Sequence, residues 1–116
     1  MAESTPTPTD ANLMARALPM AEMVATQPGA VVSRTLVSKK AGTVTLFAFD
    51  QGQGLSTHSA PYDALAMILE GAVEITIDGK DLLAKTGDMV IMPANRPHAL
   101  KAIQPFKMAL VMIKEP

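Results

Sequence analysis

The alternation of apolar and polar residues along the chain predicts strands over most of its length. From residue 30 onward apolar side chains recur at every second position and β-branched residues are frequent, as is typical of β-structure. Turn signals such as Glu70-Gly71 and Asp78-Gly79 separate the segments. The strongest candidate strands are residues 30–37, 42–49, 64–71, 72–79, 87–94 and 106–113. Six or more strands at turn intervals of about ten residues predict an all-β sandwich or barrel.

The residues before the first strand follow a different pattern. Residues 1–12 begin with a run rich in Ser, Thr and Pro that can bury almost nothing, so we expect a disordered tail. Pro19 then suits the first turn of a helix, apolar residues follow at helical spacing, and Gln27-Pro28-Gly29 ends the pattern. We therefore predict a short helix over residues 19–25, lying across the body of a domain that spans residues 13–116.

The last candidate strand is apolar on both of its faces. One face carries Met108, Leu110 and Met112, and the other carries Ala109, Val111 and Ile113. A chain this short has little material for a second layer, so self-association is a natural way to cover the outer face. We predict a homodimer, with coverage by the helix at residues 19–25 as the alternative.

Composition narrows the class of protein. A chain of 116 residues, 48% of them hydrophobic, suits one compact domain. The 10 basic and 11 acidic residues form no basic run, so we expect no nucleic-acid partner. The chain has no cysteine, which excludes disulfides and thiolate chemistry. It lacks the features of a signal peptide and any apolar run near the ~20 residues of a membrane span, so we expect a cytoplasmic protein with no membrane contact.

Glycines, histidines and a proline recur at defined spacings between residues 52 and 102. Gly52, His58 and Gly71 form a first set, and Gly87, Pro93 and His98 form a second. These spacings resemble the two motifs of the cupin superfamily over roughly residues 40–114. Four positions depart from the motifs: Ala60 for a histidine, Ala64 for a glutamate, Asn95 for a glycine and Ala102 for an asparagine. The resemblance implies a cupin-type jelly-roll β-barrel, open at one end, usually dimeric, with its metal or ligand near the motifs.

The resemblance also frames the possible metal chemistry. A cupin site of this type holds iron, manganese, zinc, nickel or copper through three imidazoles and one carboxylate, of which only His58 and His98 remain here. A stable site generally needs at least three protein ligands. Asp63 is the nearest carboxylate, and a bulge would be needed to turn it inward, because neighbouring strand residues point to opposite faces. The expected metal ligands are therefore His58, His98 and Asp63.

Four further residues are candidates for the pocket. Tyr62 could act as an acid or hydrogen-bond a ligand, although packing at a strand entrance is the alternative role. Met67 and Met92 lie at core spacings and suggest an apolar pocket wall. Arg96 lies in a loop near His98 and could clamp an anionic substrate, with a solvated loop arginine as the alternative.

Three functions remain open at this point. The first is the binding of a small molecule in the barrel, with a divalent metal held weakly by the reduced two-histidine site. The second is a metal-dependent enzyme, an oxygenase, isomerase or lyase, that acts on a small oxygenated substrate. The third is a structural dimer without an active pocket. The fold does not choose among them, because one fold hosts many functions.

Overall fold

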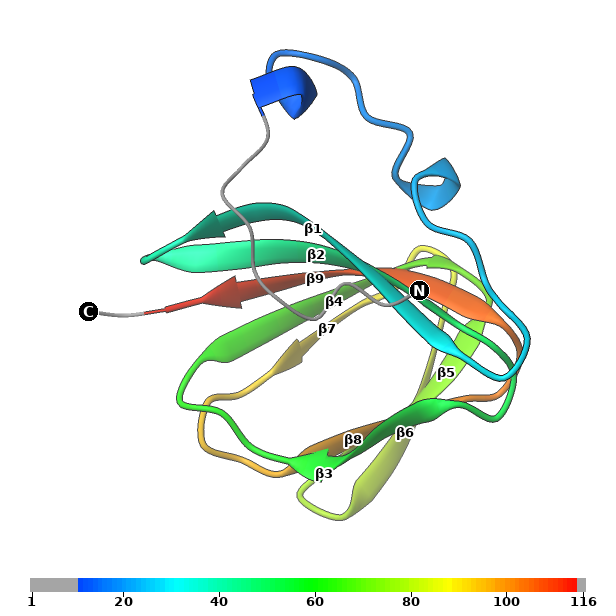
Figure 1. Cartoon of the computed structure of the whole chain (residues 1–116). Coiled ribbons are helices and arrows are strands. Elements are labelled where there is room, and N and C mark those ends of the chain that lie inside the picture. The colour runs from blue at the N-terminus through cyan, green and yellow to red at the C-terminus, as the bar shows by residue number, and fades with distance from the viewer. Residues whose placement is uncertain (1–10, 115–116) are drawn as a thin grey trace.

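The computed structural model describes residues 11–114, whose nine strands form two facing sheets (Figure 1). The larger sheet has the order β1 (Val31–Lys39), β2 (Gly42–Phe49), β9 (Phe106–Ile113), β4 (Asp63–Glu70) and β7 (Met89–Met92). The smaller sheet has the order β3 (Gly54–His58), β8 (His98–Ala102), β5 (Ala72–Ile77) and β6 (Lys80–Lys85). The predicted all-β jelly-roll barrel is confirmed. The tail predicted over residues 1–12 lies outside the described residues, except for its last two.

The chain passes repeatedly from one sheet to the other, so that the strands before and after each crossing lie in different sheets. At one end of the barrel the crossings from β2 to β3, β4 to β5, β6 to β7 and β8 to β9 are short. At the other end, residues 59–62 lead from β3 to β4 and residues 93–97 lead from β7 to β8. His58 closes β3 and His98 opens β8, so we call this second end the histidine end.

The space between the sheets is filled by the interior cluster. Phe49 and Phe106 are fully buried and stack with their ring centroids 4.5 Å apart and 9° between the ring planes. The other buried members are Ala64, Ala66, Ile68, Val73, Ile75, Ala84, Met92, Leu100, Ala102 and Met108. Burying each large apolar side chain contributes about 1.5–3 kcal/mol, so this cluster is the main source of stability for the barrel.

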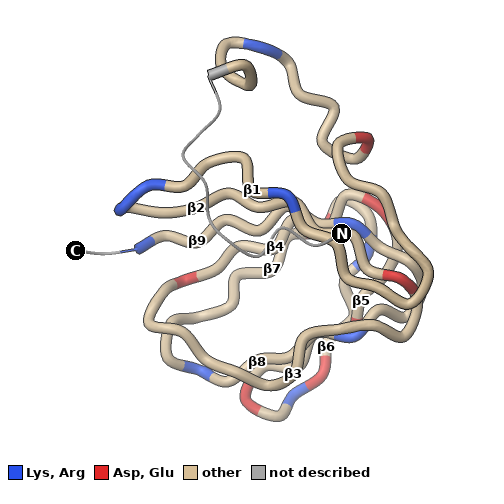
Figure 2. The backbone as a smooth tube through the Cα atoms, viewed as in Figure 1, with Lys and Arg blue, Asp and Glu red and all other residues tan. Residues whose placement is uncertain are grey.

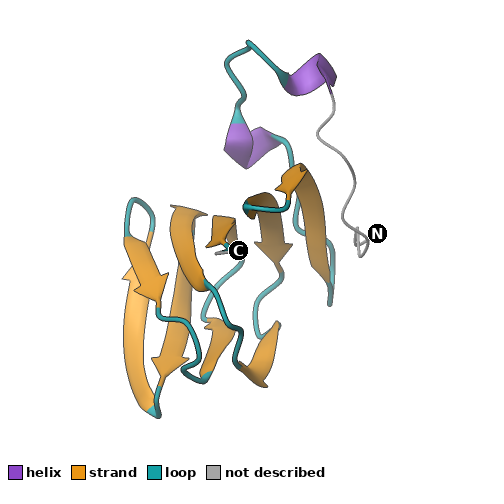
Figure 3. Cartoon of the chain, turned by 90° about the vertical axis from the view of Figure 1, so that its left-hand side faces the viewer, coloured by secondary structure: helices purple, strands orange, loops and turns teal. Residues whose placement is uncertain are grey.

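The N-terminal segment, residues 11–24, contains less helix than predicted. It forms two single 3₁₀ turns, η1 (Ala11–Leu13) and η2 (Met20–Glu22), which lie outside the strands in Figure 3. In η2 the amides of Glu22 and Met23 donate to carbonyls three residues earlier, so no α-helical turn is completed. So short a helix is marginal on its own, and the helix over residues 19–25 is reduced to one turn. Among the described residues no helix is long and apolar enough to cross a membrane.

The N-terminal segment nevertheless covers part of the outer face of the larger sheet. Val24 is buried there with Leu36, Leu46, Ala48 and Ala109, and together they form the buried part of the outer cluster. The Lys107 Nζ donates to the Ala21 carbonyl at 2.6 Å and anchors the segment to β9. Elsewhere on this face Met89, Ile91 and Ile113 remain exposed by 53%, 56% and 51%. Coverage within one chain is therefore partial, and the homodimer stays a prediction.

Candidate functional site

His58 and His98 lie side by side at the histidine end. They are direct partners across β3 and β8, and their ring centroids are 4.5 Å apart with an edge-on angle of 70°. Alternation along β8 directs His98 to the same face as the buried Leu100 and Ala102. A register shift after Leu55 restores the pairing at His58. The two imidazoles predicted to share a site are thus brought together on the inner face of the smaller sheet.

The backbone fixes which ring nitrogen of each histidine carries the proton. The Nδ1 of His58 lies 2.7 Å from the Ser56 carbonyl oxygen, and the Nδ1 of His98 lies 3.2 Å from that of Arg96. A carbonyl oxygen only accepts hydrogen bonds, so each Nδ1 must be the N–H donor. In the neutral rings both Nε2 atoms are therefore acceptors, and no hydrogen bond within the described chain occupies them.

Burial favours the neutral form of His98. The side chain is only 5% exposed, and this burial lowers the pKa of His98 from the ordinary value of 6.5. Repulsion from His58 lowers this pKa further, while the hydrogen bond to the Arg96 carbonyl acts in the opposite direction. His58 is exposed. The pair therefore combines a buried ring that resists protonation with a second ring that solvent reaches.

Asp63 does not join the histidines. It pairs with Ile113 and Ala64 pairs with Met112, in a ladder that is regular from Asp63 to Ile68, so the bulge that would turn Asp63 inward is absent. Its Oδ1 instead accepts a hydrogen bond from the amide of Ala94 at 2.9 Å. Within residues 11–114 no three His, Cys, Asp or Glu side chains gather closely enough to hold a metal ion. The expected ligand set of His58, His98 and Asp63 is therefore not assembled.

The loops that carry the two motifs are joined by their backbones. The amide of Asn95 donates to the Ala60 carbonyl at 2.7 Å, close to the contact that Asp63 makes with Ala94. Asn95 has φ 63°, a left-handed conformation that asparagine tolerates better than most residues other than glycine. This explains how asparagine stands at a position where the second motif has glycine.

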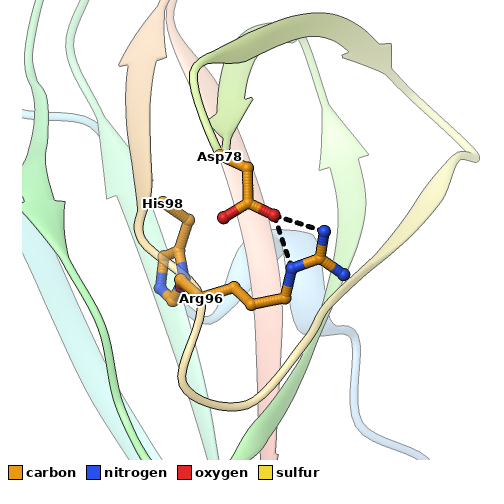
Figure 4. Close-up of polar contacts among 3 residues, drawn as sticks. All are labelled: Asp78, Arg96 and His98. Carbon is orange, nitrogen blue, oxygen red and sulfur yellow. Dashed lines mark hydrogen bonds and ion pairs between the residues drawn. The ribbon is translucent and has the colours of Figure 1, made fainter.

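Tyr62 and Arg96 lie near the histidine end but have other partners. Tyr62 lines a small hollow of about 210 Å³ together with Asp63, and the Lys114 Nζ lies 5.4 Å from the centre of its ring. Arg96 forms an ion pair with Asp78 in the turn between β5 and β6 (Figure 4). Its charge is therefore already compensated, and its contact with the site is the backbone carbonyl that orients His98.

The two methionines expected in the pocket face opposite ways. Met92 is 2% exposed and belongs to the interior cluster, directly opposite Ala64 in the pairing of β7 with β4. Met67 belongs to the outer cluster and pairs with Ala109. Met92 therefore contributes to the apolar interior near the histidine end, whereas Met67 packs on the outer face of the larger sheet.

Thr43 is a polar residue at this end that sequence reasoning missed. It pairs with Met112, which in turn pairs with Ala64, so the three side chains share the inner face of the larger sheet. Thr43 is 6% exposed, and its hydroxyl has no hydrogen-bond partner among the described residues. Leaving a buried hydroxyl unpaired costs about 1–3 kcal/mol. The signal in the sequence was a threonine at an inward-facing position of the predicted strand 42–49.

Comparison with known proteins identifies the family. The family model described as "Cupin domain" matches residues 45–114, more than half of the chain. The protein is a cupin. A conserved Streptococcus pyogenes protein of unknown function is 35% identical, with 97% of this chain and 99% of that chain covered and a TM-score of 0.87. A cupin 2 conserved barrel domain protein from Leptotrichia buccalis is 39% identical, with 84% and 47% covered and a TM-score of 0.81.

A third solved structure is similar over nearly its whole length. This cupin superfamily protein from Desulfitobacterium hafniense is 25% identical, with 97% of this chain and 100% of that chain covered and a TM-score of 0.84. No curated protein matches the chain. The comparisons therefore establish the family and the fold, and the chemistry has to be argued from the site.

The residues at the histidine end do not fit the metal ligand set that the family implies. At the glutamate position Ala64 is 5% exposed and packs among apolar side chains of the interior cluster. At the second histidine position stands Ala60, and Asp63 is engaged with Ala94. What remains is two imidazole nitrogens, fewer than the three protein ligands of a stable site.

Proposed function

We propose that this cupin binds a small molecule through hydrogen bonds to the Nε2 atoms of His58 and His98. The observation that carries the proposal is that both Nδ1 atoms are engaged by backbone carbonyls. This contact fixes each ring and its tautomer and leaves two adjacent acceptors for a ligand. The lowered pKa of His98 keeps its Nε2 available as an acceptor near neutral pH.

The surroundings of the pair suggest what kind of ligand it takes. The inner face at this end carries the apolar side chains of Met92 and Ala64, which favour an apolar ligand body. Thr43 adds a buried hydroxyl without a partner among the described residues. A small, uncharged molecule with hydroxyl or amide donors on an apolar frame would match these groups.

A metal-dependent enzyme is the second candidate function. Histidines that hold a metal usually donate their other ring N–H to a carbonyl or carboxylate, which is the arrangement found at both Nδ1 atoms. A divalent ion bound here would have two protein nitrogens and would take its remaining ligands from solvent or substrate. We therefore expect weak binding, and a metal centre ranks below direct recognition by the imidazoles.

The experiment compares wild-type protein with His58→Asn and His98→Asn. Asparagine can keep a donor close to the position of Nδ1, toward the carbonyl, while removing Nε2. A fragment library of neutral hydroxyl and amide compounds is screened by ligand-observed NMR, after the metal content of tag-free protein has been measured by elemental mass spectrometry. We expect little metal and hits that weaken about tenfold or more in both variants.

Two outcomes would redirect this proposal. About one transition-metal ion per chain, lost in both variants, would favour the enzyme. Hits that bind both variants as tightly as wild type would mean that the histidines are structural. Lys101→Gln provides the matched control, because Lys101 is exposed on β8 three residues beyond His98.

We also propose that the protein is a homodimer. Ile91 and Ile113 are exposed on the outer face of the larger sheet, where they flank Leu65 and Val111. A contiguous apolar patch of this kind is typical of an interface. Light scattering should give twice the chain mass for wild type and the single chain mass for Ile91→Lys; a monomeric wild type would contradict the proposal.

A further inference from the structure

A hollow lies on the opposite side of the larger sheet from the histidines, between the N-terminal segment and the first two strands. Its volume is about 490 Å³, within the range of small-molecule sites. Its floor and walls are mainly aliphatic and include Leu13, Leu18, Met20, Leu36 and Val44. We call it the N-terminal hollow.

The floor of this hollow depends on an irregularity in β1. The pairing of β1 with β2 shifts register between Thr35 and Val37. As a result the consecutive residues Leu36 and Val37 both pack in the outer cluster, although neighbours in a regular strand face opposite ways. The bulge therefore widens the apolar floor under the N-terminal segment.

Two cations line the otherwise apolar walls. Arg16 comes from the loop between η1 and η2, and Lys39 ends β1. Figure 2 shows basic positions on this loop and at the turn between β1 and β2. None of the described residues that line it is acidic. Within residues 11–114 Lys39 forms no ion pair, and Arg16 donates only to the Asn12 carbonyl at 3.1 Å.

We propose that the N-terminal hollow binds an amphipathic carboxylate, with its alkyl chain on the aliphatic floor and its carboxylate between Arg16 and Lys39. The apolar lining favours the chain, and the two cations, which have no acidic partner within residues 11–114, favour an anionic head over a neutral or cationic one.

This site is independent of the histidines. It lies on the outer face, in the outer cluster rather than the interior cluster, and it needs no residue of the proposed site at the histidine end. Success or failure of one proposal leaves the other standing.

The test uses decanoate, below its micelle concentration, with the full chain. Protein carrying ¹³C-methyl methionine is titrated by NMR, because Met14 and Met20 line the hollow while Met92 and Met108 are buried in the interior cluster. We expect the Met14 and Met20 signals to shift and the interior ones to stay. The double variant Arg16→Gln/Lys39→Gln should raise the dissociation constant about tenfold, as two partly exposed charge contacts would.

Two controls, a neutral analogue and a second double variant, test this interpretation. Decanol should bind about tenfold more weakly than decanoate, since it lacks the charge; equal affinity would overturn the proposal. The variant Lys80→Gln/Lys101→Gln removes two exposed cations of the smaller sheet and should bind decanoate like wild type. Absence of binding, or an unchanged dissociation constant in the Arg16→Gln/Lys39→Gln variant, would also overturn it. So would a change from dimer to monomer on adding decanoate, because a second copy would then be the natural occupant.

Discussion

His58 and His98 are direct partners across β3 and β8, yet the first imidazole is exposed and the second is 5% exposed. The asymmetry arises because β3 is an edge strand of the smaller sheet whereas β8 lies between β3 and β5. Neighbours on both sides shield His98. Two chemically identical groups thus have different environments, and burial lowers the pKa of His98.

Stability should fall on mild acidification because of His98. The unfolded chain gains a proton near the ordinary pKa of 6.5, while the folded His98, whose pKa is lowered, gains it only at a lower pH. The contribution of His98 to the free energy of unfolding is therefore complete above the ordinary pKa. It decreases as the pH falls toward the folded-state pKa. Urea unfolding between about pH 5 and 8 should show this loss in wild type and a smaller one in His98→Asn. Equal pH dependence in the two proteins would contradict it.

Removing His58 should raise the pKa of His98 only part of the way to its ordinary value of 6.5. Burial is the largest cause of the lowered pKa, and repulsion from His58 is the second. In His58→Asn the repulsion disappears but the burial remains. An NMR titration of the His98 ring should give a pKa above that in wild type and still below 6.5. A return to the ordinary value would mean that charge repulsion, not burial, dominates.

Thr43→Val should not destabilise the barrel. The valine retains the shape of the side chain and removes a buried hydroxyl that has no partner among the described residues, so the free energy of unfolding should stay equal or rise by about 1–3 kcal/mol. Chemical denaturation measures this directly. Thr45→Val, at the next inward-facing position of β2, is the matched control. A clear loss of stability in Thr43→Val alone would show that the hydroxyl is satisfied.

Asp63→Ala should loosen the histidine end without acting through a metal. The change removes the acceptor of the Ala94 amide and should cost about 1–2 kcal/mol, whereas Asp63→Asn keeps an acceptor and should cost less. Hydrogen exchange at the Ala94 amide would report the loss locally. If Asp63→Asn instead abolished metal binding while leaving stability intact, Asp63 would have to be a ligand.

Gly71→Ala should destabilise the fold far more than Gly79→Ala. Both glycines have positive φ, 87° and 77°, so alanine costs about 1–2 kcal/mol at either position. At Gly71 an added Cβ would also lie 2.8 Å from Phe106 Cα and would collide with the Pro105 carbonyl, whereas at Gly79 nothing lies within 4 Å. Thermal unfolding of the two variants separates backbone strain from the collision, and similar melting temperatures would contradict this account.

The strands could be predicted from local signals, because turn residues and alternation mark the hairpins. The histidine pair could be predicted only from the resemblance of the spacing of Gly52, His58, Gly87 and His98 to the cupin motifs. The face of Met67 could not be predicted, because the stretch Ala64–Leu69 is apolar on both sides and its parity is decided by pairing with β9.

The partner of Asp63 was also beyond local reasoning. Its oxygen is captured by an amide 31 residues away, and only the closed barrel brings the two loops together. The helix predicted over residues 19–25 was wrong for a local reason. The residues that begin and end it were correctly identified, but too few residues lie between them. The dimer, the bound ligand and the cytoplasmic location remain predictions.

Each histidine ring is oriented by the carbonyl two residues before it, Ser56 for His58 and Arg96 for His98. Each contact lies within three consecutive residues, at the end of β3 for His58 and at the entry to β8 for His98, and needs no partner from the opposite sheet. The orientation and the tautomer of each ring can thus be fixed by three consecutive residues, before the sheets close over the interior. The pairing of β3 with β8 would then bring together two rings that are already oriented, and closure of the two sheets would supply the burial of His98.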